Sequence, residues 1–256
     1  MNPIYGPVSS WRLGKSLGVD LICQEPKVCS FDCVYCQLGK TDRKTTIREQ
    51  FVDTEVVRNE LDRVLSVTEI DSLTFSGMGE PTLASNLAEI VEYIKETYPV
   101  KTAILTNSSI LGDNDILEAL YRVDSVVAKL DACNQASFKK INRPLKGLLF
   151  EEMLDNIKRF KYNYHGKLAL QIMFINDNEP FVKQIVKIAY EIDPDEIQIN
   201  TPLRPCGVMP LSKERIAAIC QEFRGFKNVI SVYTSNKPEV SAIDLEEVRK
   251  RKRPEP

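Results

Sequence analysis

Histidine is almost absent from this chain of 256 residues, which contains only His165. A Ser/His/Asp triad and a His-rich zinc site both need imidazole groups, so this scarcity argues against both classes of site. His165 stands in a Lys-Tyr-Asn-Tyr-His-Gly run that predicts a loop between two elements. No apolar run is long enough to cross a bilayer, and the N-terminus lacks a signal-peptide pattern. The cytoplasm is therefore the expected location.

A large excess of either charge is also missing, because 34 basic and 36 acidic residues leave a formal net charge of −2. Nothing in the whole chain therefore indicates a nucleic-acid binder. Local basic clusters at residues 139–146 and 249–253 are interpreted as solvated surface. Seven cysteines, an odd number, argue against a fully paired disulfide framework. We expect one globular domain over residues 1–240 and a polar basic tail over residues 241–256.

Three of the seven cysteines stand close together, as Cys29, Cys33 and Cys36 in a C-x3-C-x2-C spacing. One short loop can wrap three such thiolates around a soft metal centre. A structural zinc site wants four protein ligands, whereas a [4Fe–4S] cluster held by three cysteines keeps one iron open for chemistry. The spacing therefore favours a reactive cluster over a structural metal site.

Short β-rich apolar runs alternate with longer segments of helical period along the chain. The predicted strands cover residues 17–22, 73–76, 102–105, 125–130, 168–174 and 196–200, with a further short strand at 229–233. The predicted helices cover residues 53–65, 87–94, 113–121, 150–160, 181–192 and 212–223. About six βα units in a row predict an α/β fold with a parallel sheet, either a partial (β/α)6 barrel or an open doubly wound sheet.

Polar residues gather where these predicted strands end, which is the reactive rim of a parallel barrel. They are Gly77, Met78, Gly79, Glu80, Asn107, Ser108, Lys129, Asp131, Gln171 and Asn200. Each could instead begin a turn or cap a helix, and Lys129 and Asp131 share one side of their strand, where they could form a salt bridge. Because at least five strands contribute, we expect the groups to surround one small polar molecule beside the cysteine loop.

Taken together, these motifs resemble the radical S-adenosylmethionine (SAM) superfamily, whose fold is a partial (β/α)6 barrel like part of a TIM barrel. The resemblance extends to the wyosine-synthase-like iron–sulfur oxidoreductase branch. It rests on residues 9–20 (SSWRLGKSLGVD), 29–38 (CSFDCVYCQL), 75–83 (FSGMGEPTL), 106–109, 129–131 and 141–144 (INRP). Relatives in that branch carry further upstream cysteines and a C-terminal winged-helix module, whereas this chain has only Cys23 upstream and stops at residue 256.

The resemblance implies a role for each matching residue. Cys29, Cys33 and Cys36 would ligate a [4Fe–4S] cluster, Tyr35 would lie against the adenine of SAM, and Gly79 and Glu80 would hold its methionine ammonium group. Met78 replaces the first glycine of the family's Gly-Gly-Glu turn, although Gly77 precedes it. The residues expected at the ribose and carboxylate are Asn107, Ser108, Lys129, Asp131, Arg143 and Asn200.

The activity implied is reductive cleavage of SAM to a 5′-deoxyadenosyl radical, which abstracts hydrogen from an unidentified substrate. A flavodoxin- or ferredoxin-type donor would supply the electron, and no membrane partner is expected. Cys133 and Cys206 are candidate catalytic residues, while Cys220 is interpreted as core. Two alternatives stay open: a non-catalytic iron–sulfur or zinc module closed by Cys23, and a tRNA-modifying, wyosine-like or RNA-binding protein led by the basic tail.

Overall fold

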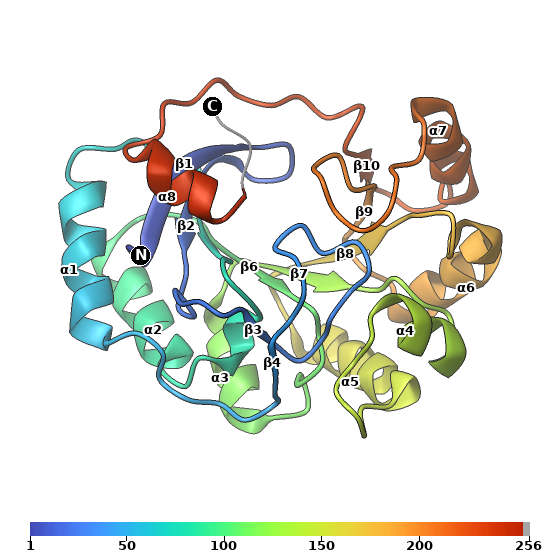
Figure 1. Ribbon diagram of the computed structural model, residues 1–256, viewed down its shortest axis with the longest axis horizontal. Helices are drawn as coiled ribbons and strands as arrows, with labels where there is room; N and C mark the ends of the chain where they lie inside the picture. Colours follow the sequence, from blue (N-terminus) through green and yellow to red (C-terminus); the bar gives the residue numbers. More distant parts are fainter. Residues whose placement is uncertain (253–256) are drawn as a thin grey trace.

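The computed structural model describes residues 1–252 and contains one eight-stranded sheet (Figure 1). Its strands lie in the order β1 (Ile4–Ser10), β2 (Gly14–Val19), β5 (Ser72–Phe75), β6 (Thr102–Thr106), β7 (Ser125–Lys129), β8 (Lys167–Met173), β9 (Glu196–Asn200) and β10 (Val229–Ser231). β1 and β2 pair antiparallel, and all later neighbours pair parallel. A doubly wound sheet reverses its strand order, and this sheet does not. The fold is therefore α/β, with parallel strands curled into a half-barrel.

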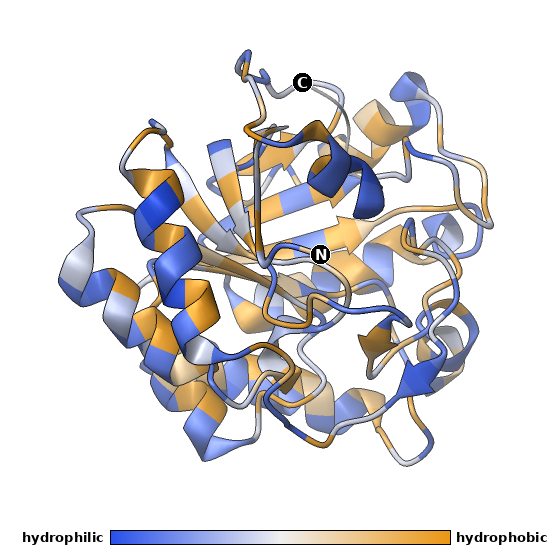
Figure 2. Ribbon diagram, turned by 60° about the vertical axis from the view of Figure 1, so that its left-hand side comes forward, coloured by the Kyte–Doolittle hydropathy of each residue, from blue (hydrophilic) through white to orange (hydrophobic). Residues whose placement is uncertain are grey.

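Amphipathic helices cover the outer face of the sheet, and Figure 2 shows their apolar sides turned toward largely apolar strands. They are α1 (Thr54–Leu65), α2 (Leu87–Thr97), α3 (Asn114–Arg122), α5 (Phe150–Asn163), α6 (Val182–Ile192) and α7 (Lys213–Glu222). Asp53 and Asp113 start α1 and α3 by accepting backbone N–H groups of the first turn. Among the described residues no helix has the length and apolarity that a bilayer crossing requires.

Several short elements escaped the sequence pattern. β1 was not expected, because Gly6 and Pro7 interrupt its apolar run. It packs closely against β2 because Gly18 faces the Tyr5 ring, and a Cβ on Gly18 would lie 2.1 Å from a ring carbon. β3 (Val28–Cys29) and β4 (Arg43–Lys44) pair in parallel around the cysteine loop. The short helix α4 (Gln135–Ile141) begins at an Asn134 capping box, and the 3-10 turns η1 (Pro81–Leu83) and η2 (Glu179–Phe181) complete the chain.

The segment expected to be a solvated tail instead contains helix α8 (Leu245–Lys250), which packs on β1 (Figure 1). Asp244 caps this helix, and Arg251 directly after it is fully buried. The solvated interpretation is therefore wrong for Arg251, because its guanidinium pairs with Asp20 and Glu247 at 2.8 Å each. Residues 253–256 lie outside the described part of the chain, and the domain division at residue 240 stays a prediction.

Candidate functional site

The cysteine loop lies across the C-terminal ends of the strands and is anchored to the end of α4. The amide of Asp32 donates to the Asn142 carbonyl at 3.0 Å, and that of Val34 to the Ile141 carbonyl at 2.9 Å. Phe31 is buried edge-on against Phe138, with ring centroids 5.2 Å apart. These contacts hold a segment of little regular structure in one conformation.

Each of the three cysteine sulfurs accepts an N–H from a different side chain. Asn107 Nδ2 lies 3.5 Å from Cys29 Sγ, and Asn142 Nδ2 lies 3.5 Å from Cys33 Sγ. Lys27 Nζ lies 3.0 Å from Cys36 Sγ. Hydrogen bonds to sulfur are one of the features by which proteins set the potential of an iron–sulfur cluster. The donor set is therefore suited to stabilising thiolate ligands.

Burial raises the pKa of the Cys29 thiol to about 12, with the Glu80 carboxylate adding to the effect. Burial likewise raises the pKa of Cys33 to about 11, helped by Asp131. All seven cysteines are free. Without a metal these two thiols are protonated at neutral pH, and ligation of a metal releases their protons.

The three cysteines line one cavity of about 200 Å³, here called the cluster pocket. It also collects six further residues expected at the site: Tyr35, Gly79, Glu80, Asn107, Lys129 and Gln171. The remaining lining residues are Phe31, Gln37, Leu38, Leu105, Thr106, Met173, Arg204 and Arg251. No three His, Cys, Asp or Glu side chains of the described chain converge on a single ion. A cubane differs from such an ion site in that each thiolate binds its own iron.

The Gly-Met-Gly-Glu turn after β5 needs both of its glycines. A Cβ on Gly79 would lie 1.8 Å from the Val28 carbonyl oxygen, and one on Gly77 would lie 2.0 Å from the Asp20 carboxyl carbon. Met78, the departure from the family pattern, is buried beside Ile22 and Val28 and donates its amide to Asp20 at 3.1 Å. A side chain is tolerated at Met78 because it packs in a small apolar cluster.

The Glu80 carboxylate ties the ends of β5 and β6 together. It accepts hydrogen bonds at 2.7 Å from Thr82 Oγ1, Thr106 Oγ1 and the Asn107 amide. Burial raises the pKa of Glu80, although these bonds act in the opposite direction. The structure thus gives the carboxylate a positioning role, since its bonds hold Asn107 beside Cys29.

Lys129 and Asp131 form the salt bridge anticipated from their strand parity, with Nζ 3.4 Å from Oδ1. The buried Asp131 also accepts from the Tyr35 hydroxyl and, at 2.9 Å, from Asn142 Nδ2. Lys129 Nζ lies 4.9 Å from the centre of the Tyr35 ring. Burial raises the pKa of Tyr35, with Asp131 adding to the shift, so the hydroxyl remains a donor.

Other expected residues do not line the cluster pocket. Ser108 and Asp131 are buried behind it, and Arg143 is exposed outside it, while its backbone carbonyl accepts from the Asp32 amide at 3.3 Å. Asn200 lines a neighbouring cavity, and of the turn after β5 only Gly79 and Glu80 line the cluster pocket, whereas Gly77 and Met78 do not. Cys133, Cys206 and Cys23 do not line the pocket, and Cys220 on α7 is only partly buried. Cys23 instead contacts Arg251 Nη2 at 3.3 Å.

Among the residues of the site that sequence reasoning missed are Lys27, Asn142 and Arg251. Lys27 stands two positions before Cys29, and Asn142 lies within the INRP segment, so both were near recognised motifs. Nothing in the sequence connects Arg251 with Asp20, which is 231 positions away.

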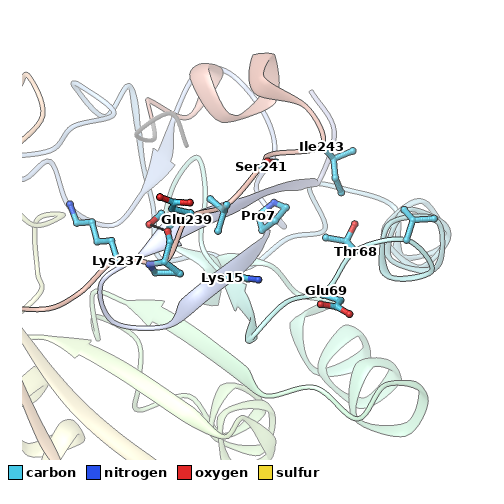
Figure 3. Close-up of a pocket in the computed structure, with 12 residues that line it drawn as sticks. Pro7, Lys15, Thr68, Glu69, Lys237, Glu239, Ser241 and Ile243 are labelled. Atoms are coloured by element: carbon cyan, nitrogen blue, oxygen red, sulfur yellow. Dashed lines mark hydrogen bonds between the residues drawn. The ribbon is translucent and has the colours of Figure 1, made fainter.

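A larger cavity of about 880 Å³ lies elsewhere, between β1, the loop before β5 and residues 237–243 (Figure 3). Its lining contains no cysteine and none of the residues that line the cluster pocket. Its volume alone therefore does not connect it with the chemistry of the three thiols.

The half-barrel fold and the pocket lined by three cysteines together define an α/β protein whose cysteines have the arrangement of ligands to an iron–sulfur cluster. The profile described as the radical SAM superfamily matches residues 26–189, more than half of the chain, and the chain belongs to this family. Members of this superfamily are enzymes that use a [4Fe–4S] cluster and SAM.

Similar proteins refine this placement. The chain is 39% identical to a UPF0026 protein of Synechocystis over 82% of this chain and 78% of that protein. Its fold resembles native anSMEcpe with bound AdoMet, at a TM-score of 0.62 and 18% identity over 85% and 64% of the two chains. Archaeal TYW1 superimposes with a TM-score of 0.55 and 15% identity over 82% and 71%. At that identity TYW1 shares the fold, and membership of the wyosine-synthase-like branch stays a prediction.

Proposed function

We propose that this protein is a radical SAM enzyme that binds a [4Fe–4S] cluster through Cys29, Cys33 and Cys36. The observation that carries the proposal is the arrangement of their sulfurs, which face one pocket and each accept an N–H from a different side chain. Three cysteines line the pocket, which suits a cubane with one open iron, whereas a closed zinc site needs a fourth protein ligand. Cys23, the candidate fourth ligand, lies outside the pocket.

The bound cofactors would supply a 5′-deoxyadenosyl radical by one-electron reductive cleavage of SAM, and the protein would direct it to a substrate hydrogen. Asn107, Asn142 and Lys27 would stabilise the thiolates. Gly79 would offer its backbone to the methionine ammonium group, and Glu80 would keep that turn beside Asn107. Tyr35 would provide an aromatic wall, fixed by its hydroxyl bond to Asp131. Lys129, one of the cations that line the pocket, is suited to a carboxylate.

The decisive test is anaerobic. The protein is reconstituted with iron and sulfide, reduced with dithionite and mixed with SAM, and 5′-deoxyadenosine is measured by chromatography. We expect 5′-deoxyadenosine from the intact chain and none from Cys29→Ala. Cys220→Ala, which removes a partly buried thiol outside the pocket, is the matched control and should retain activity. Cleavage that survives in Cys29→Ala would overturn the cluster assignment.

The proposal includes a flavodoxin- or ferredoxin-type protein as the physiological electron donor to the cluster. Reduction of the cluster by such a protein in place of dithionite would yield 5′-deoxyadenosine at a comparable stoichiometry.

The tRNA-directed alternative loses its main support, because Arg251 of the basic run is buried in ion pairs rather than free to contact phosphates. Absence of tRNA binding at low salt is the expected result.

A further inference from the structure

The basic side chains of residues 139–146 stay on the surface, and the site described so far makes no use of their charges. Their segment lies beside the cysteine loop, because the Asp32 amide donates to the Arg143 carbonyl at 3.3 Å. A further exposed cation joins them from β4, where Lys44 Nζ lies 3.4 Å from the same Arg143 carbonyl. The cations here called the basic patch are Lys44, Lys139, Arg143 and Lys146, and all four are exposed.

The charges of the basic patch are not neutralised by ion pairs. Two other cations of the same segments do have such partners. Arg43 is paired with Glu49, and Lys140 lies 3.0 Å from Asp177. The four cations of the patch form no ion pair within residues 1–252. Because uncompensated charges of one sign attract the opposite sign and speed its encounter, the patch suits an acidic partner.

The basic patch lies close to two of the three cysteines. Lys44 is the partner of Cys29 in the parallel pairing of β3 with β4. Arg143 directly follows Asn142, whose Nδ2 lies 3.5 Å from Cys33 Sγ. None of the four cations lines the cluster pocket, so they would stay accessible while SAM and a substrate occupy it. An electron that arrives at the patch therefore has little more than the backbone of the cysteine loop to cross.

Each of the two segments that carry the patch also exposes an aliphatic side chain. Ile47 is 71% exposed and Leu149 is 47% exposed. Residues 42–49 and 139–149 contain no aromatic side chain. Single-stranded RNA is commonly held by stacking of its bases on aromatic rings, whereas protein interfaces combine apolar contacts with a polar rim. The composition of the surface therefore favours a protein partner over RNA.

We propose that the basic patch is the docking surface for the electron donor, an acidic protein of the flavodoxin type. The four cations attract its acidic surface, and Ile47 and Leu149 contact the apolar edge of its flavin. One electron passes from the anionic flavin hydroquinone, which becomes the neutral semiquinone, to the oxidised cluster, and no proton moves. Electron-transfer encounters bury less than about 1,200 Å², so a small surface is sufficient. This inference rests on the proposed function for its meaning as a point of electron entry, although docking can be measured without SAM.

The docking surface is tested by a pair of variants that each lose two positive charges. Lys44→Gln/Lys146→Gln, the patch variant, removes two cations of the basic patch. Lys101→Gln/Lys227→Gln, the control variant, removes two exposed cations shortly before β6 and β10. Because the cysteine loop lies at the C-terminal ends of the parallel strands, the control positions lie at the opposite rim of the sheet. The affinity of purified flavodoxin for the full-length reconstituted protein is measured by surface plasmon resonance over a series of sodium chloride concentrations.

The dissociation constant of the patch variant is expected to rise about fivefold at low salt, as the loss of two exposed charge contacts predicts. The control variant should bind like the parent protein. Added salt should weaken binding of the parent more than binding of the patch variant, which has fewer charges to screen. Equal weakening in both variants, or an affinity that is independent of salt, would overturn the proposal. Tighter binding of tRNA than of flavodoxin, lost in the patch variant, would assign the surface to RNA and overturn it as well.

Formation of 5′-deoxyadenosine separates this proposal from the proposed function. With photoreduced flavodoxin as the reductant, the patch variant should form 5′-deoxyadenosine more slowly than the control variant. With dithionite, which needs no docking surface, both variants should match the parent. Salt-dependent docking without 5′-deoxyadenosine from either reductant would refute the radical SAM proposal alone. Conversely, 5′-deoxyadenosine from dithionite without docking of flavodoxin would refute the docking surface alone.

Discussion

Replacement of Arg251 by alanine tests whether the end of the chain stabilises the site. The guanidinium is fully buried and lies 2.8 Å from both Asp20 and Glu247, and it also donates to the Asn2 carbonyl at 2.6 Å. Its removal leaves Asp20, itself buried, without its cationic partner. Breaking a buried pair from one side costs about 3–5 kcal/mol. We therefore expect Arg251→Ala to lower the free energy of unfolding by roughly that amount.

Thermal unfolding followed by circular dichroism measures this loss. A protein of this size loses about 2–4 °C of Tm for each kcal/mol, so the expected decrease is roughly 6–20 °C. Arg63→Ala is the matched control, because Arg63 is exposed on α1 and pairs with Glu60 only at the surface. That change should cost less than about 1 kcal/mol. Equal Tm values for Arg251→Ala and Arg63→Ala would refute the reasoning.

Three further changes test other parts of the structure. Gly79→Ala should abolish SAM binding in an equilibrium dialysis assay, because its new Cβ would lie 1.8 Å from a backbone carbonyl oxygen, and unchanged affinity would contradict this. Lys27→Met should lower the potential of the reconstituted cluster by roughly 60 mV, about 1.4 kcal/mol for one electron, in an EPR redox titration. Lys40→Met, which removes a nearby exposed charge, should leave the potential unchanged. Burial acts to raise the pKa of Glu247, but hydrogen bonds from basic neighbours outweigh it and lower the pKa to about 2. The stabilisation from Glu247 is complete above the pKa of about 4.3 that the group has in the unfolded chain, and it is lost as the pH falls toward 2. Urea unfolding should therefore show that the free energy of unfolding falls less between neutral and acid pH in Glu247→Gln than in the parent protein.

Periodicity predicted the parts of the fold in which apolar residues recur at the spacing of a helix or a strand. The parallel strands and outer helices carry apolar stripes such as Leu87, Ile90 and Ile94, and their positions were correct within a few residues. β1 carries Gly6 and Pro7, which read as a turn, and its pairing with β2 becomes visible only when Gly18 is seen under Tyr5. Local pattern therefore predicts elements that bury a stripe, and it misses elements that depend on one close approach.

The residues of the candidate site likewise fall into those that the sequence pattern reveals and those that only the fold brings together. Cys29, Cys33 and Cys36 were recognisable because their spacing is itself the signal. Asn142 reaches Cys33 only because the loop is bonded to the end of α4, a contact across 109 positions. Arg143, one position later, was expected at the carboxylate of SAM, but its side chain is exposed and does not line the pocket. Which of two adjacent polar residues reaches a cysteine sulfur depends on the direction of the backbone, and sequence spacing contains no information about that direction.

The end of the chain connects three parts of the candidate site. Arg251 binds Asp20, whose carboxylate also accepts the amide of Met78 in the turn that follows β5. Lys252 Nζ lies 3.4 Å from the Leu38 carbonyl at the end of the cysteine loop, and its own carbonyl accepts from Arg204. Because Asp20 is shared, the turn at Met78 is held by an ion pair from the opposite end of the sequence. A cofactor seated against that turn would therefore be expected to stabilise α8, and loss of Arg251 would be expected to weaken SAM binding as well as folding.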